Sequence, residues 1–195
     1  MNLVQNKPVP NQKGTREIVW LGQQWPSLDH CTVQPISRGW IFNGQLVAVV
    51  KSRPFGVNYT ITVDKSFKTR TVMIEKIDPD GKKERLRITA SQHSWNVNGR
   101  SRSDLVGCDD IDLEFSPVTN TLPIRRARPR IGSKIDLTTV WVRFPSLMVQ
   151  KLRQSYERLG KHDYRYRSGR GFSAKLELDE FGLVNRYGNI WKRAD

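Results

Sequence analysis

The sequence of 195 residues has only two cysteines, Cys31 and Cys108, which is too few for a disulfide-rich scaffold. It also has no uncharged apolar run long enough to span a bilayer, so we expect no transmembrane segment. Residues 1–16 are polar and basic, and they lack the apolar stretch of a secretion signal. We therefore expect two reduced thiols, a flexible basic tail over residues 1–16, and a cytoplasmic location.

The motifs of common catalytic and cofactor-binding sites are missing as well. There is no Gly-x-Ser-x-Gly elbow, phosphate-binding loop or dinucleotide fingerprint. The histidines His30, His93 and His162 and the two cysteines do not fall at metal-ligand spacing. The sequence therefore predicts a protein that is not an enzyme and that holds no cofactor and no metal.

Acidic residues are scarce relative to basic ones, with 19 against 33 and a net charge of +14. Such a field attracts nucleic acid, anionic lipid headgroups or acidic proteins. The apolar content of 37% and six tryptophans are enough for a packed interior, which argues against disorder. We expect one domain over residues 17–195.

Outside the centre, the chain reads as short strands broken by turn residues, because β-branched and aromatic residues alternate with polar ones. Asn43-Gly44 between apolar residues predicts a tight hairpin, since both positions of such a turn need positive φ. Asp78-Pro79-Asp80-Gly81 predicts a second hairpin. The expected strands cover residues 17–21, 32–36, 40–42, 45–50, 59–63, 71–77, 85–89, 134–144, 163–167, 174–178, 183–187 and 190–192.

The central stretch, residues 95–126, is the least ordinary part of the sequence. Ile111, Leu113 and Phe115 alternate with acids, which is the period of a strand with one apolar face. Ser116-Pro117 then favours a helix start, because serine can cap free N–H groups and proline has no N–H to lose. Pro123 limits this helix to one or two turns, with a continuation towards Arg126.

The acids of that strand are Asp109, Asp110, Asp112 and Glu114. Those at alternate positions could bind a hard cation or act as an acid/base pair. No recognised calcium-binding spacing supports the first role. We favour a structural pairing of these acids with Arg125 and Arg126.

Several motifs resemble the bacterial glycolipid-binding family. They are Gly107-Cys108 with the strand that follows, Ser116-Pro117-x-Thr119-Asn120-Thr121-Leu122-Pro123-Ile124-Arg125-Arg126, Gly39-Trp40 and Trp95 upstream, and Tyr156, Tyr164-Arg165-Tyr166 and Trp191 downstream. The resemblance implies a mainly β fold, a long antiparallel sheet coiled as a spiral β-roll around a single short α-helix near residues 117–126, able to form a homodimer. Asp109 and Ser116 depart from the family pattern.

Residues 148–159 can be interpreted in two ways. Met148, Leu152, Tyr156 and Leu159 fall at helical spacing and would form an apolar stripe. The resemblance implies instead a strand that turns at Gly160, and we follow it.

The polar residues Thr119, Asn120, Thr121, Arg125 and Arg126 form the candidate headgroup site, because hydroxyl, amide and guanidinium groups suit a sugar or phosphate. The alternative is that the Thr and Asn side chains hold the backbone of a broken helix. The aromatic candidates for a ligand cavity are Trp40, Trp95, Tyr156 and Tyr166. With the resemblance, these residues predict non-catalytic binding of an amphipathic ligand such as a lipid or glycolipid.

Two other functions remain open. Arg125-Arg126-x-Arg128-x-Arg130 and Tyr164-Arg165-Tyr166-Arg167 interleave charge with rings, which could contact phosphates and stack bases of a nucleic acid. No recognised nucleic-acid motif accompanies them, so this partner is less favoured. An enzyme acting on an anionic substrate is the third interpretation.

Overall fold

The computed structural model describes residues 14–91 and 94–194. Most of the tail predicted over residues 1–16 and the candidate residue His93 lie outside the described residues, whereas Arg16 already begins the first strand. None of the helices in the described part of the chain is long and apolar enough to cross a membrane.

The described residues form one 15-stranded sheet and a short helical segment, so the predicted mainly β fold is confirmed. The strands are β1 (Arg16–Gly22), β2 (Ser27–Ile36), β3 (Gly39–Val50), β4 (Arg53–Asp64), β5 (Thr69–Ile77), β6 (Lys83–Ser91), β7 (Ser94–Val97), β8 (Arg100–Ser101), β9 (Asp110–Leu113), β10 (Lys134–Val142), β11 (Val149–Arg158), β12 (Asp163–Ser168), β13 (Ser173–Leu178), β14 (Val184–Tyr187) and β15 (Trp191–Arg193). The helical elements are the 3₁₀ turns η1 (Ser103–Leu105) and η2 (Pro117–Asn120) and the α-helix α1 (Thr121–Ala127).

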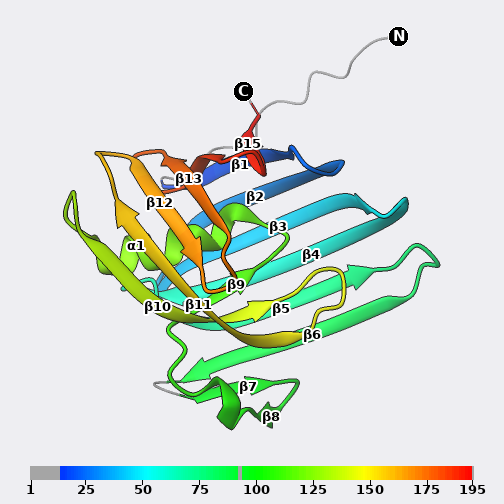
Figure 1. The fold of residues 1–195 in the computed structure, drawn as a ribbon. Coiled ribbons are helices and arrows are strands. Elements are labelled where there is room, and N and C mark those ends of the chain that lie inside the picture. The colour runs from blue at the N-terminus through cyan, green and yellow to red at the C-terminus, as the bar shows by residue number, and fades with distance from the viewer. Residues whose placement is uncertain (1–13, 92–93, 195) are drawn as a thin grey trace.

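The sheet is continuous in space but is made of two sequence-contiguous halves. The N-terminal half, β1 to β8, and the C-terminal half, β9 to β15, meet where β1 pairs with β15. The sheet is not closed, because β8 and β9 form its two edges. It curls so that β10 to β13 lie in front of β2 to β5, with α1 between the two layers (Figure 1).

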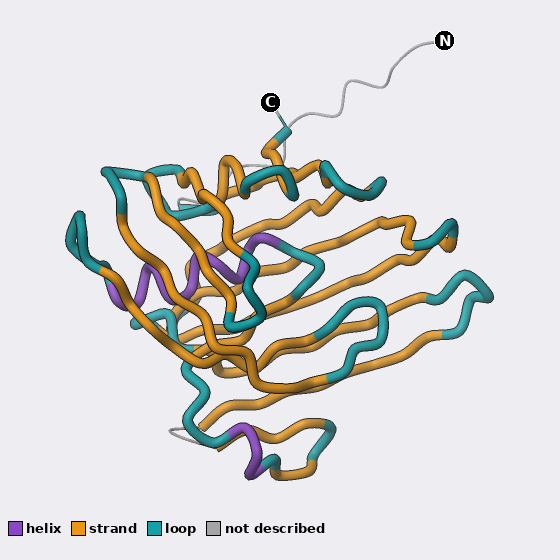
Figure 2. The backbone as a smooth tube through the Cα atoms, viewed as in Figure 1, coloured by secondary structure: helices purple, strands orange, loops and turns teal. Residues whose placement is uncertain are grey.

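One pair of strands departs from the antiparallel sheet that the resemblance implies. β9 and β10 are parallel, with Ile111 opposite Val140. Parallel neighbours need a crossover, and here η2 and α1 supply it. The sheet is therefore mixed, and its one parallel connection places the helical segment inside the curl (Figure 2).

The helical segment begins as the sequence predicts and is held by a buried polar cluster. Ser116 Oγ accepts a hydrogen bond from the backbone N–H of Val118 at 3.3 Å, which caps η2. The same hydroxyl donates to Asp29 Oδ2 on β2 at 2.5 Å, and the Tyr59 hydroxyl on β4 donates to Asp29 at 3.1 Å. Burial raises the pKa of Asp29 to about 7, because the ionised carboxyl has lost water. This cluster fixes the segment to the N-terminal half of the sheet.

Pro123 does not end the helix. It lies in the first turn of α1, where a backbone N–H would have no helical partner, so its missing donor costs little. The helix continues to Ala127 and ends at Arg128, whose φ of +44° is left-handed. The short helix predicted over residues 117–126 is thus confirmed.

The hairpin predicted at Asn43-Gly44 is wrong. β3 runs unbroken through both residues, and the turn comes later at Lys51-Ser52, where φ is +50° and +62°. Gly44 is needed for another reason: a Cβ there would lie 1.9 Å from the Tyr59 ring, which packs across the strand. Gly44 is therefore required by the close approach of Tyr59 on β4 and not by a turn.

The helical periodicity of residues 148–159 is also misleading, and the strand implied by the resemblance is confirmed as β11. Met148 and Leu159, the two ends of the supposed apolar stripe, are exposed. Leu152 and Tyr156 are buried because they lie on the inner face of the sheet between β10 and β12.

Candidate functional site

A cavity of about 620 Å³ lies between the two halves of the curled sheet, beside the helical segment. Its walls come from β9 to β12, from η2, from the ends of β3, β14 and β15, and from the turn between β1 and β2. Cavities of this size commonly hold small ligands. The curl of the sheet and the crossover between β9 and β10 therefore create the most obvious binding site of the described residues.

Aromatic rings make up much of the lining. Trp25 stacks on Phe144 with centroids 5.8 Å apart, and Tyr166 meets Tyr187 edge-on at 5.7 Å. Phe172 lies 6.0 Å from Tyr166 and 39% of its surface is exposed, so it stands at the mouth. The remaining rings of the lining are Trp141 and Trp191. Such walls suit the C–H face of a sugar ring or an apolar chain.

Polar groups gather at the floor of the cavity, where the lining residues Ser116 and Asn120 are buried and Asp112 is half-buried. Asp112 Oδ1 accepts a hydrogen bond from Thr119 Oγ1 at 3.1 Å, and Oδ2 accepts one from Gln154 Nε2 at 2.5 Å. A carboxylate has about four acceptor sites, so Asp112 retains capacity for a ligand hydroxyl.

Burial raises the pKa of Asp112 to about 6. The hydrogen bonds from Gln154 and Thr119 oppose this rise, whereas the charge of Glu114 adds to it. The Asp112 carboxyl therefore gains a proton, and with it one hydrogen-bond donor, as the pH falls through about 6.

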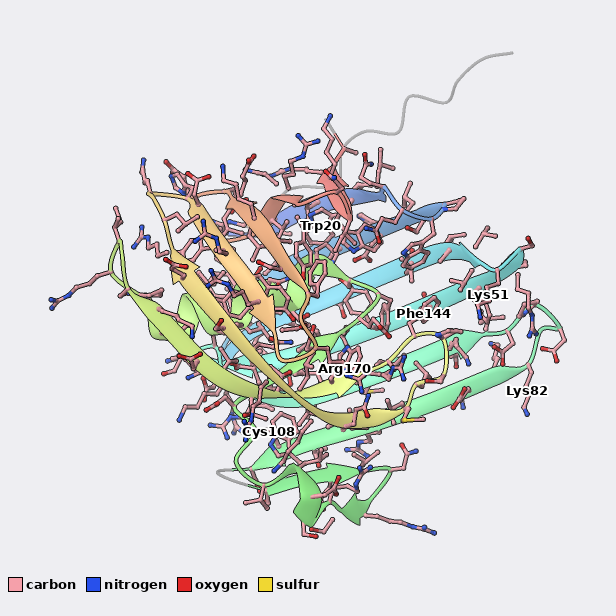
Figure 3. The ribbon with its side chains drawn as sticks, in the orientation of Figure 1. Trp20, Lys51, Lys82, Cys108, Phe144 and Arg170 are labelled. Atoms are coloured by element: carbon pink, nitrogen blue, oxygen red, sulfur yellow. The ribbon has the colours of Figure 1, made fainter. Side chains whose placement is uncertain are left out.

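The mouth carries positive charge. Lys51 and Arg170 are exposed residues of the lining, and the Arg143 side chain is 39% exposed. The guanidinium carbons of Arg143 and Arg170 lie 5.1 Å and 5.0 Å from the centroid of one ring, that of Trp141. In Figure 3 the label of Phe144 lies between those of Arg170 and Lys51.

Two of the predicted ligand residues, Asn120 and Tyr166, line this cavity. Tyr156 lies directly behind them: its hydroxyl donates to Asn120 Oδ1 at 2.9 Å, and its ring meets that of Tyr166 at 5.3 Å. Tyr156 itself is not in the lining, and it positions the two residues that are.

The predicted residues Thr119 and Thr121 use their hydroxyls within the protein. Thr119 Oγ1 donates to Asp112 and accepts from the backbone N–H of Leu113 at 3.2 Å. Thr121 Oγ1 donates to the carbonyl of Gly182 at 2.9 Å. Both therefore hold the helical segment in place, which is the structural alternative considered for this motif.

The pairing predicted between the central acids and the adjacent arginines is confirmed for Asp110 and Arg126. Arg126 donates to Asp110 Oδ2 at 2.7 Å, and Asp110 is fully buried. Burial raises the pKa of Asp110, and the bond from Arg126 opposes the rise. Neither residue lines the cavity.

Arg125 lies at the far end of α1, away from the cavity. Its guanidinium carbon is 4.7 Å from the ring centroid of Phe67 and 4.5 Å from that of Phe181. Trp40, another predicted ligand residue, packs on both of these rings at 5.8 Å and 5.0 Å. No ion pair involves Arg125 within the described ranges. The side chains of this cluster therefore pack against one another.

Trp95 is the remaining candidate, and it is buried on β7 near the edge of the sheet. Its indole N–H donates to the carbonyl of Cys108 at 3.2 Å. It borders a hollow of about 120 Å³, which is separate from the cavity described above.

Sequence reasoning did not single out most of the lining. Besides Asn120 and Tyr166, the polar lining residues that the sequence analysis named are Ser116 and the acids Asp112 and Glu114. Lys51, Phe172 and Arg170 lie in turns, where no periodicity marks a residue as inward-facing.

No cluster that could hold a metal ion occurs in residues 14–91 and 94–194. His30 contacts Glu17 at 2.6 Å, and both cysteines are free.

The fold and the cavity define an open β-roll whose curled sheet encloses a helical segment and a ligand-sized space. The chain belongs to the family described as "Putative glycolipid-binding", which matches residues 17–193. It is similar to the crystal structure of a DUF1089 family protein from Pseudomonas aeruginosa, with 28% identity and a TM-score of 0.78 over 86% of this chain and 92% of the other. No curated protein matches it.

Proposed function

We propose that this protein binds an amphipathic, sugar-bearing ligand such as a glycolipid, without catalysing a reaction on it. The observation that carries the proposal is the cavity of about 620 Å³, in which aromatic walls stand over a polar floor. The description of the family supports the same ligand class.

The sugar would occupy the floor. Asp112 can accept further hydrogen bonds, and Asn120 Nδ2 has one N–H left after its bond to the Pro117 carbonyl at 3.1 Å. Tyr166 and Tyr187 present rings beside these groups. Adjacent donors, acceptors and rings are what a hydroxyl-rich ring with C–H faces requires.

The apolar part of the bound ligand would extend outwards through the mouth of the cavity. Phe172, Phe144 and Trp25 supply apolar surface there, and burying such surface against a chain contributes ~25 cal/mol per Å². This orientation places the acyl part outermost, where the protein could receive it from or return it to a membrane.

Native mass spectrometry of the purified protein, followed by organic extraction, tests the proposal. A co-purifying lipid with a sugar headgroup is the expected result, and Phe172→Ala should lower its occupancy several-fold. Met73→Ala is the matched control, because Met73 is an exposed apolar residue that is not in the lining. Equal loss in both variants would contradict binding in this cavity.

The raised pKa of Asp112 supports a second candidate function, in which the protein is an enzyme that acts on the same ligand. A carboxyl with a pKa of about 6 could donate or accept a proton near neutral pH, and Glu114 is close enough to affect that pKa. Incubation of the extracted lipid with fresh protein distinguishes the two functions: a free sugar or a shortened lipid would replace the binding proposal by catalysis.

Nucleic-acid binding is less well supported. Tyr164 and Tyr166 are 5% and 4% exposed, so their rings do not lie on the outer surface, where the bases of a nucleic acid would stack. Arg165 and Arg167 both contact Glu157, at 3.1 Å and 3.2 Å. Salt-sensitive retention of nucleic acid during purification would favour this function. The homodimer and the cytoplasmic location stay predictions, which sedimentation and cell fractionation can test.

A further inference from the structure

We infer that the mouth of the cavity is an anion-binding site, formed by Arg143, Arg170 and Lys51, and that the ligand carries a phosphate or similar anionic group next to its sugar. This inference rests on the proposed function for the sugar, but the anion site itself stands on its own geometry.

The first observation is that two guanidinium groups share one indole. Arg143 follows β10 and Arg170 lies in the turn between β12 and β13, yet both lie within 5.1 Å of the Trp141 centroid. Both positive groups are held near one side chain, so an anion bound beside the Trp141 ring is attracted by both. The planar donors of arginine fit the oxygens of a phosphate in pairs.

The second observation is the shortage of counter-ions. In the part of the chain that the structure describes, no ion pair involves Arg170 or Lys51. Arg143 approaches Glu114 only to 4.0 Å, and its Nε is buried without a hydrogen-bond partner. Some arginines elsewhere make close pairs, as Arg102 does with Asp104 at 2.7 Å, whereas others such as Arg125 make none among the described residues.

The carboxylates of the cavity neutralise these cations only in part. Glu114 Oε2 accepts the backbone N–H of Phe144 at 2.6 Å, which holds it to the backbone beyond β10. Asp112 is bound to Thr119 and Gln154 at the floor. The mouth therefore has three cations against one exposed carboxylate, so an entering anion would meet a favourable field.

The order of groups along the cavity then specifies the ligand. Acceptors and rings lie at the floor, cations at the mouth, and exposed Phe172 beside them. A sugar joined through a phosphate to an apolar chain presents its groups in the same order. A neutral glycolipid would leave the guanidinium groups without partners.

Titration with inorganic phosphate, followed through the arginine Nε–H signals in NMR spectra, tests the anion site without any sugar. We expect saturable shifts for Arg143 and Arg170 and none for Arg38, an exposed arginine outside the lining. Comparable shifts for Arg38 would show an adventitious attraction of phosphate to the basic surface and would overturn the inference.

Variants give the second test. Lys51→Gln with Arg170→Gln should weaken phosphate binding about tenfold, or ~1.4 kcal/mol. The charge-matched control, Arg38→Gln with Lys65→Gln, should leave it unchanged. Arg170→Lys keeps the charge and should recover part of the loss, whereas a purely structural arginine on Trp141 would show none of this pattern.

Vesicles then distinguish the source of the anion. Phosphatidylcholine vesicles are doped at equal mole fraction with phosphatidylinositol, with an uncharged galactolipid or with phosphatidylglycerol. Preference for phosphatidylinositol over both others supports an anionic lipid whose headgroup carries a ring of hydroxyl groups. Equal transfer of the galactolipid and phosphatidylinositol would refute the anion requirement and leave the proposed function intact. Transfer of none, with phosphate still bound, would refute the proposed function and leave a site for a free phosphorylated compound.

Discussion

Arginine side chains lie beside aromatic rings at both ends of the helical segment, but only one end faces the cavity. At the packed end, Arg125 lies between the rings of Phe67 and Phe181. At the open end, Asn120 faces the cavity, whose mouth sets Arg143 and Arg170 against Trp141. Arginine beside aromatic rings is thus found at both ends.

The difference is whether the protein fills the space around the charge itself. Arg125 is half-buried against two rings of the chain, and a Cβ at Gly182 would come within 3.3 Å of its side chain. Arg170 has one ring on one side and the cavity on the other. Residue type therefore identifies an arginine–aromatic cluster, and only the space beside it indicates whether a ligand can enter.

Among the variants that compare the two ends, Arg126→Ala should change the free energy of unfolding most. This variant leaves the buried carboxyl of Asp110 without its partner, which typically costs ~3–5 kcal/mol of unfolding free energy. Arg128→Ala, an exposed arginine at the end of the same helix, should change stability by less than ~0.5 kcal/mol. Urea unfolding of both variants measures the difference, and similar midpoints would show that the ion pair contributes nothing.

Arg125→Ala should come next. It removes two cation–π contacts and leaves a gap between the rings, so we expect a loss of about 2–3 kcal/mol. Phosphate binding by the folded fraction should not change. Arg170→Ala should do the reverse, with nearly full stability and weaker phosphate binding. If both variants lost binding to the same extent, the distinction between the ends would fail.

A smaller effect concerns the carboxyl that anchors the segment near its open end. The pKa of Asp29 is about 7 when folded, against 3.8 for the free group, so between these values the folded state binds more protons than the unfolded state. The contribution of Asp29 to stability is therefore full at low pH and is lost as pH rises through about 7. Asp29→Asn should flatten this slope in chemical denaturation between pH 4 and pH 7, and an unchanged slope would show that Asp29 is ionised throughout.

The smallest effect is expected from Asp112→Asn. The pKa of Asp112 is about 6, so its contribution to stability falls in the same direction as pH rises, and the window ends near pH 6. Asp112→Asn should flatten the slope of stability between pH 4 and pH 6, and the pH dependence of sugar-lipid binding should disappear. Binding that keeps its pH profile in this variant would remove Asp112 from the floor of the site.

Most of the fold could be predicted because its determinants are local. Alternation of apolar and polar residues indicated the strands, and Ser116-Pro117 indicated the start of the helix. The hairpin at Asn43-Gly44 failed because Tyr59 on the neighbouring strand decides why a glycine is there. The alternation of residue types and the turn propensity of Asn-Gly contain no information about this contact between neighbouring strands.

The site was predicted much less well. Asn120 was included for its amide group and Tyr166 for its aromatic ring, and both line the cavity. Arg125 was grouped with them by sequence proximity, but α1 carries it to the other end of the segment. Lys51 and Arg170 are brought together only by the curl of the sheet, for which the sequence contains no short-range signal.

The junction of β1 with β15 has a consequence for biosynthesis. β15 is the last strand of this sheet in chain order, and it bridges β1 and β14 through Gly22 opposite Trp191 and Tyr187 opposite Trp191. While the chain emerges from the ribosome, both of those edges stay without a neighbour until every other strand has been made. The edge of β1 therefore stays open while all the other strands are made, and the wall of the cavity formed by Trp191 is the last to be completed.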